Sequence, residues 1–195
     1  MPYHSQGQPV HDPKILRAIA HPVRNRILTE LTASGSMRAA DLARELDIPA
    51  NQASFHLRQL AKYGLVEEDP EAARDKRDRV WRPTSDHGLM VRLDDIEKAP
   101  GGKAASAVFR QNAASWGHAV VDAAYDGPRD PDTLRTINES AIKLTQEEAG
   151  QLAEELDAVI ATWTQRTRGR DPDRRTYLWF SVLQPYPETL VAEED

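Results

Sequence analysis

Apolar side chains between residues 37 and 68 recur at helical spacing in two runs, with a short break between them. The first run predicts a helix over 40–46, which Pro49 ends, because proline restricts the residue before it and cannot continue a helix. The second run predicts a helix over 50–63, with Gly64 just past its end, where glycine commonly closes a helix. The inward positions are Leu42, Ala43, Leu46, Ala53, Leu57, Leu60 and Ala61.

The outward face of the second helix carries donors and acceptors but no acid. No acidic residue occurs between Ala50 and Val66, whereas a solvated surface helix usually mixes Glu with Lys. Amide, hydroxyl and guanidinium groups pair with base edges and phosphates in a major groove. The pattern therefore indicates a DNA-reading helix-turn-helix, and the alternative is an ordinary pair of packed helices. The outward residues are Asn51, Gln52, Ser54, Phe55, Arg58 and Lys62.

A short strand is predicted over 65–68 and a returning strand over 79–83. The polar connection between them carries basic residues, which Asp75 and Asp78 dilute. A two-stranded ribbon with a basic tip beside a recognition helix is a wing, whose cations neutralise phosphates or enter a minor groove. The basic residues of this candidate wing are Arg74, Lys76, Arg77 and Arg79.

Residues 12–84 resemble the ArsR-type winged-helix transcription regulators. The segment "IAHPVRNRILTEL" resembles the opening helices of that family, and "ASFHLRQLAKYGLVEE" resembles its recognition helix running into the wing. The resemblance implies an α+β fold with a winged helix-turn-helix domain, here over residues 12–92, that binds double-stranded DNA. The DNA contacts that it implies are Asn51, Gln52, Ser54, Phe55, His56 and Arg58, with less certain contacts along the wing. His56 has a competing role as a packing or capping histidine.

The family includes many metal sensors, and this chain departs from that pattern. It contains no cysteine, which excludes thiolate metal sites and disulfides. His118 with Asp122, one helical turn apart, and Asp86 with His87 are the pairs best placed to share a metal ion, but no further ligand is evident. We therefore expect no metal and no cofactor.

The net charge of −6 is unevenly distributed. Residues 1–92 contain 14 Lys or Arg and 12 Asp or Glu, a net charge of +2, whereas residues 93–195 contain 11 and 19, a net charge of −8. The acidic second half should face away from phosphates. The first half is only mildly basic, so its non-specific affinity for DNA should be modest, which favours a dimer that docks on two half-sites.

A proline and two glycines at 99–103 predict a linker, followed by a distal domain over 103–190. Helices are predicted over 106–125 and 144–166, the second with Thr145 as N-cap and Glu148 completing a capping box. The segments 136–144 and 177–183 are predicted strands, the second rich in aromatic and β-branched residues. The distal half is thus expected to be a helical or α/β dimerisation domain.

Two roles of the distal half remain open from the sequence. In the first, the apolar stripe of the helix predicted over 106–125, which includes Trp116, pairs with its symmetry mate and fixes the spacing of two recognition helices. In the second, aromatic residues line a pocket for a small-molecule effector. The candidate pocket residues are Trp116, Trp163, Tyr177 and Trp179.

The sequence favours a regulator over an enzyme. It contains no GxGxxG, P-loop, HExxH or GxSxG motif. No apolar run is long enough to cross a membrane, and the first ten residues lack a signal-peptide layout, so we expect a cytoplasmic protein. The prediction is a homodimeric transcription regulator, a repressor, that an effector releases from DNA. The alternative is a winged-helix protein-interaction module without DNA binding.

Overall fold

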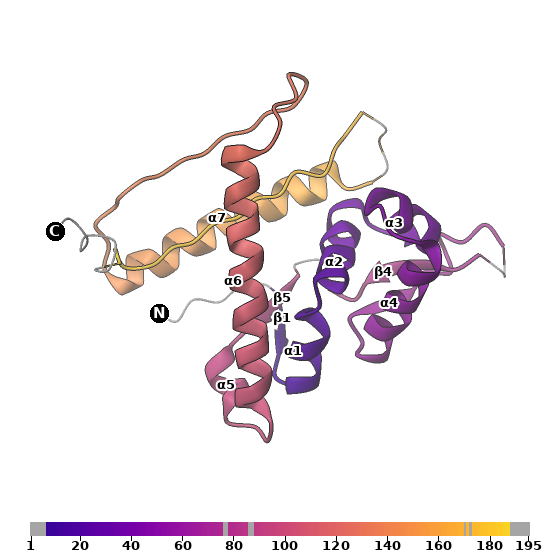
Figure 1. Ribbon diagram of the computed structural model, residues 1–195, viewed down its shortest axis with the longest axis horizontal. Coiled ribbons are helices and arrows are strands. Elements are labelled where there is room, and N and C mark those ends of the chain that lie inside the picture. The colour runs from indigo at the N-terminus through magenta and orange to yellow at the C-terminus, as the bar shows by residue number, and fades with distance from the viewer. Residues whose placement is uncertain (1–6, 76–77, 86–87, 170, 172, 188–195) are drawn as a thin grey trace.

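The computed structural model describes residues 7–75, 78–85, 88–169, 171 and 173–187, and it has mixed α and β structure (Figure 1). This confirms the predicted α+β class. The helices are α1 (Pro13–Ile19), α2 (Pro22–Ser34), α3 (Ala39–Glu45), α4 (Ala50–Lys62), α5 (Leu93–Glu97), α6 (Gly102–Asp126) and α7 (Gln146–Thr167). The strands are β1 (Gln8–Val10), β2 (Met37–Arg38), β3 (Val66–Glu68), β4 (Val80–Pro83) and β5 (Leu89–Val91).

Helices α2, α3 and α4 pack against a three-stranded antiparallel sheet in the order β2-β4-β3. The central strand β4 brings Trp81 opposite both Met37 and Glu68. The inward side chains of α3 and α4 are buried with Trp81 in one core, because apolar area removed from water stabilises the packed state. The helical periodicity therefore identified the core side of both helices correctly.

The predicted limits of the two central helices are confirmed to within one residue. Asp47 adopts a positive φ of 51° in the turn between α3 and α4, so the chain reverses sharply before Pro49. Gly64 has φ of 67° just after α4, the left-handed conformation expected of a residue that closes a helix. From that turn the chain enters β3 and returns as β4, as predicted. Together these elements form a winged helix-turn-helix.

The chain around 99–103 is a tight turn between α5 and α6. Gly101 has φ of 75°, and a Cβ atom at Gly102 would lie 1.8 Å from the carbonyl oxygen of Ile96. The first turns of α6 pack on α1 and α5, with Ala105 and Ser106 fully buried. The start of α6 is therefore attached directly to the winged helix, on the same side as the parallel pair β1–β5.

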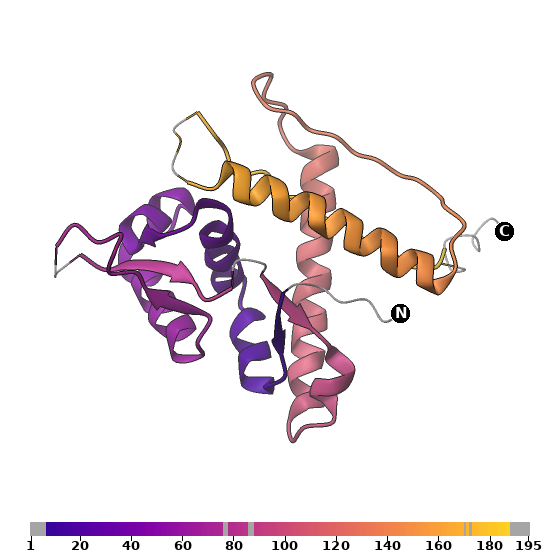
Figure 2. The same ribbon diagram turned by 180° about the vertical axis from the view of Figure 1, so that it is seen from behind.

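The distal part consists of the outer turns of α6, the helix α7 and two extended segments. Both views show α7 crossing α6, with its N-terminal half lying beyond the other helices (Figures 1 and 2). The capping box predicted for α7 is present: the Glu148 backbone N–H donates to Thr145 Oγ1 at 3.2 Å, and the Thr145 N–H donates to Glu148 Oε2 at 2.8 Å.

The strands predicted over 136–144 and 177–183 are wrong. Both segments are described, and neither is part of a sheet. Just before the first segment, the Leu134 N–H donates to the Tyr177 hydroxyl of the second at 3.2 Å, which is not a ladder of backbone hydrogen bonds. A β-strand depends on a neighbouring strand that satisfies its backbone groups, and a high β propensity alone does not supply that neighbour. The distal part of this chain is accordingly helical.

Candidate nucleic-acid interface

Helix α4 presents one continuous stripe without acidic residues to solvent. Asn51, Phe55, Arg58 and Lys62 follow one another at spacings of four, three and four residues, which places them on one helical face. All four are exposed, and Gln52 and Ser54 flank them in half-buried positions. This arrangement brings together six of the seven residues that the sequence predicted on the recognition helix.

The opposite face of α4 holds the stripe in place. Ala53, Leu57 and Leu60 are fully buried and face α2, α3 and β3. At the N-terminus of the helix, the Gln52 N–H donates to Asn51 Oδ1 at 2.9 Å, which leaves the amide nitrogen of Asn51 as its outward donor. A rigid scaffold that fixes short polar side chains is what base readout in a groove needs.

His56 does not belong to that stripe. It is only 4% exposed, and its ring packs against His21, the N-cap residue of α2, with ring centroids 4.7 Å apart. Phe55 meets the same ring edge-on at 5.3 Å. Of the two roles that the sequence left open for His56, the structure supports packing, and burial removes it from the outward surface.

The surroundings of the two histidines disfavour the protonated ring. Neither His21 Nδ1 nor His56 Nδ1 has a hydrogen-bond partner, although both atoms are buried. Burial lowers the pKa of each imidazole, and the charge of nearby Arg24 on α2 lowers both further. The contact between the recognition helix α4 and α2 therefore contains two histidines whose pKa values are lowered.

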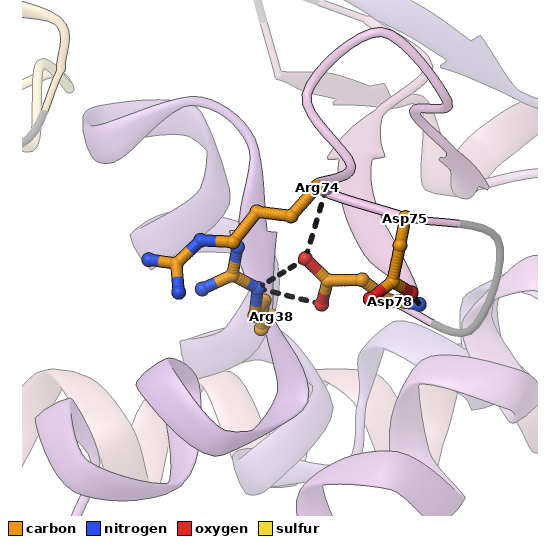
Figure 3. A pocket seen from close by; sticks show the side chains of 4 residues that line it. All are labelled: Arg38, Arg74, Asp75 and Asp78. Atoms are coloured by element: carbon orange, nitrogen blue, oxygen red, sulfur yellow. Dashed lines mark hydrogen bonds and ion pairs between the residues drawn. The ribbon is translucent and has the colours of Figure 1, made fainter.

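The wing is braced at its base by an ion pair. Arg38 Nε, at the start of α3, lies 2.6 Å from Asp78 Oδ1, and the Arg74 N–H donates to Asp78 Oδ2 at 3.2 Å (Figure 3). The hydrogen bond from Arg38 lowers the pKa of the Asp78 carboxyl. In Figure 3 the Arg74 guanidinium extends past that of Arg38, which puts two cations on the same side of Asp78. Asp78 thus positions the wing as well as diluting its charge.

Of the remaining predicted wing residues, the structure describes Arg79 but not Lys76 or Arg77. Arg79 Nε lies 3.5 Å from Glu68 Oε1, with both side chains more than half exposed. Exposed ion pairs of this kind contribute little to stability, so Arg79 can exchange Glu68 for a phosphate at small cost. Lys76 and Arg77 lie outside the described residues. Sequence reasoning missed Arg38, because only the pairing of β2 with β4 brings it to the wing.

The candidate effector residues are open to solvent. Trp116, Trp163, Tyr177 and Trp179 are between 38% and 61% exposed, which is more than an enclosed ligand pocket allows. The Arg166 guanidinium lies 4.8 Å from the centre of the Trp163 ring and covers one of its faces. The pocket therefore stays a prediction.

His118 and Asp122 lie on α6, whereas Asp86 and His87 fall outside the described residues. Within the part of the chain that the structure describes, no group of three or more His, Asp and Glu side chains is placed to hold a metal ion. The described helices also include none that combines the length and hydropathy of a membrane span.

The match to one family model agrees with the geometry of α2 to β3. Residues 19–69, about a quarter of the chain, match the sequence model of a family described as "Helix-turn-helix domain". The chain therefore carries a helix-turn-helix domain. Among solved structures, the chain is similar to a double mutant of ZitR from Lactococcus lactis in its apo form. The sequences are 14% identical, the alignment covers 74% of this chain and 83% of that chain, and the TM-score is 0.31. No curated protein matches the chain.

Proposed function

We propose that the protein is a sequence-specific, DNA-binding transcription regulator of the ArsR type, without enzymatic activity. The observation that carries the proposal is the acid-free stripe on α4, in which Asn51, Phe55, Arg58 and Lys62 stand exposed on a rigidly packed helix. Arg and Asn side chains at such positions form bidentate contacts with guanine and adenine edges in the major groove. The wing supplies Arg74, Arg79 and, by sequence, Lys76 and Arg77 for the adjoining phosphates.

We propose further that the protein acts as a homodimer in the cytoplasm. The net charge of +2 over residues 1–92 gives each winged helix little non-specific attraction to DNA. Two copies on half-sites about one helical turn apart double the number of contacts and restore affinity. In this proposal residues 12–92 read DNA and residues 103–190 hold the dimer together.

We also propose that the protein regulates by repression. A dimer seated across two half-sites would block access to a promoter, and a small molecule that re-spaces the two recognition helices would release it. Four of the exposed aromatic residues of the distal part are the proposed effector contacts: Trp116, Trp163, Tyr177 and Trp179.

The test is fluorescence anisotropy of the full chain against labelled fragments of genomic DNA, at several salt concentrations. We expect a subset of fragments to bind at least a thousandfold more tightly than the average, as specific regulators do. Uniform weak binding, or none, would contradict the proposal and leave a protein-interaction module in its place. Titration of tryptophan fluorescence with candidate ligands, repeated on the DNA complex, tests the effector step, and equal DNA affinity with and without every ligand would refute release.

A further inference from the structure

The distal part of the chain exposes a large amount of aromatic surface. Seven aromatic residues are between 38% and 68% exposed, which at about 100 Å² each leaves on the order of 700 Å² of aromatic surface in contact with water. The seven are Trp116, Tyr125, Trp163, Tyr177, Trp179, Phe180 and Tyr186.

Helix α7 contributes an ordered stripe to this surface. Leu152, Leu156, Val159 and Trp163 recur at spacings of four, three and four residues, the pattern of a helix that packs along another helix. The last three are 42–55% exposed, and α7 has no buried residue at all. Helices in proteins gain most of their stability when their apolar face packs against another element. We therefore expect a partner to cover this stripe.

The arrangement of the stripe points to an identical helix as that partner. Its midpoint, between Leu156 and Val159, lies within one residue of the midpoint of α7. A second α7 running antiparallel about a two-fold axis there would set Leu156 against Val159 of the other copy and Leu152 against Trp163. The whole stripe would be used by both chains, as an isologous contact requires.

The charges of α7 are complementary to themselves in the same orientation. Its first twelve residues, 146–157, carry five acids, while Arg166 stands in its last turn. Antiparallel pairing places acidic turns of one helix beside basic residues of the other, whereas parallel pairing places like charges together. A typical stable interface buries about 800 Å² on each partner, and the stripe with its flanking aromatic residues can supply that area.

We infer that α7 packs antiparallel against α7 of a second copy, and that this contact is the seam of the homodimer. The inference rests on the proposed homodimer and states where the two copies meet. Because α7 contacts α2, the seam is connected to the winged helix of each copy through a helix of its core. The distance between the recognition helices would then depend on this seam.

The experiment uses the lack of native cysteine. Val159→Cys places one thiol of each copy beside the proposed two-fold axis, on opposite sides of it. The two cysteines are offset by three residues, about 4.5 Å along the helix axes, which is compatible with the Cα separation of about 4.4–6.8 Å that a disulfide spans. Ala158→Cys is the matched control, equally exposed and equally central, but turned about 100° round the helix and out of the stripe. Each full-length variant is oxidised at low micromolar concentration and resolved on a non-reducing gel, and its mass in solution is measured by light scattering.

We expect Val159→Cys to form at least five times more covalent dimer than Ala158→Cys. Equal trapping of the two variants would overturn the inference. A dimeric mass without selective trapping at Val159 would also overturn it, because the copies would then meet through another surface, yet it would leave the proposed function intact. DNA binding measured on the same preparations tests the proposed function separately, since Val159 is remote from α4.

Discussion

Replacing Arg58 by alanine should remove one DNA contact from each recognition helix. Arg58 is exposed in the middle of the α4 stripe, so its loss should change the free energy of unfolding by no more than about 0.5 kcal/mol. A contact of this kind contributes about 1–3 kcal/mol to binding, and a dimer contains two. We therefore expect Arg58→Ala to weaken operator binding by about 2–6 kcal/mol, which is roughly thirtyfold or more.

The dependence of binding on salt shows which part of the DNA Arg58 contacts. If both guanidinium groups neutralise phosphates, the slope of log K against log salt should become shallower by about 2. If they read base edges, the affinity should fall for the operator and remain nearly constant for unrelated DNA. Either result supports the proposed interface, because each requires Arg58 to reach the duplex.

The matched control is Arg110→Ala. Arg110 lies on α6, is about half exposed and pairs with Glu97 at 2.7 Å. It has the same charge and similar exposure, but it is remote from α4, so its loss should leave operator affinity within about twofold of the wild type. Fluorescence anisotropy over 50–300 mM salt measures both variants. An Arg58→Ala protein with wild-type affinity and an unchanged salt slope would refute the assignment of α4 as the reading helix.

Three further predictions concern the elements that hold α4 and α7. Burial and the charge of Arg24 lower the pKa of His21, and burial, His21 and Arg24 lower the pKa of His56, so the unfolded chain binds more protons below about pH 6.5. The free energy of unfolding should therefore decrease as the pH falls from 6.5 through the pKa values of the two histidines in the folded state. In urea unfolding from pH 7.5 to 4.5, His56→Phe should make this decrease less steep. An equally steep decrease in the variant would contradict the role of His56. Gly64→Ala should lower the free energy of unfolding by about 1 kcal/mol, because a φ of 67° strains alanine, although no atom lies within 4 Å of the new Cβ. An unchanged free energy of unfolding would show that the turn relaxes to a different φ. Thr145→Ala should remove the cap of α7, which should lower the free energy of unfolding by about 1 kcal/mol and reduce the helical circular dichroism signal. The control Thr162→Ala, on the same helix but away from its ends, should cause neither change. Equal effects of the two substitutions would exclude capping as the cause.

Local periodicity was sufficient for the recognition helix and its turn. The spacing of Leu57 and Leu60 determined which face of α4 is buried, and Gly64 marked where the helix ends, because both features depend on residues close in sequence. The residues of the exposed stripe could then be predicted as those on the opposite face of the helix. The sequence alone could not decide between the two roles of His56, because this residue lies at the edge between the two faces. Its burial depends on His21, which is 35 positions away in sequence.

Features that depend on distant pairing could not be predicted from the pattern. Strand β2 is only two residues long and exists because β4 returns beside it, and this pairing places Arg38 at the base of the wing. The reverse error occurred at 177–183, whose aromatic and β-branched residues favour a strand, although no strand among the described residues pairs with this segment. A propensity indicates what a segment tolerates, and a sheet requires a second segment as well.

Selection of bound sequences from a random or genomic DNA pool tests the central claim most directly, because it measures specificity and symmetry together. The full-length protein should enrich a two-fold symmetric sequence whose half-site centres lie about 10 base pairs, or a multiple of that distance, apart. Arg58→Ala, passed through the same selection, should lose that enrichment. Recovery of no shared sequence by the wild-type protein, or of the same sequences by both proteins, would contradict the assignment of α4 as the DNA-reading helix.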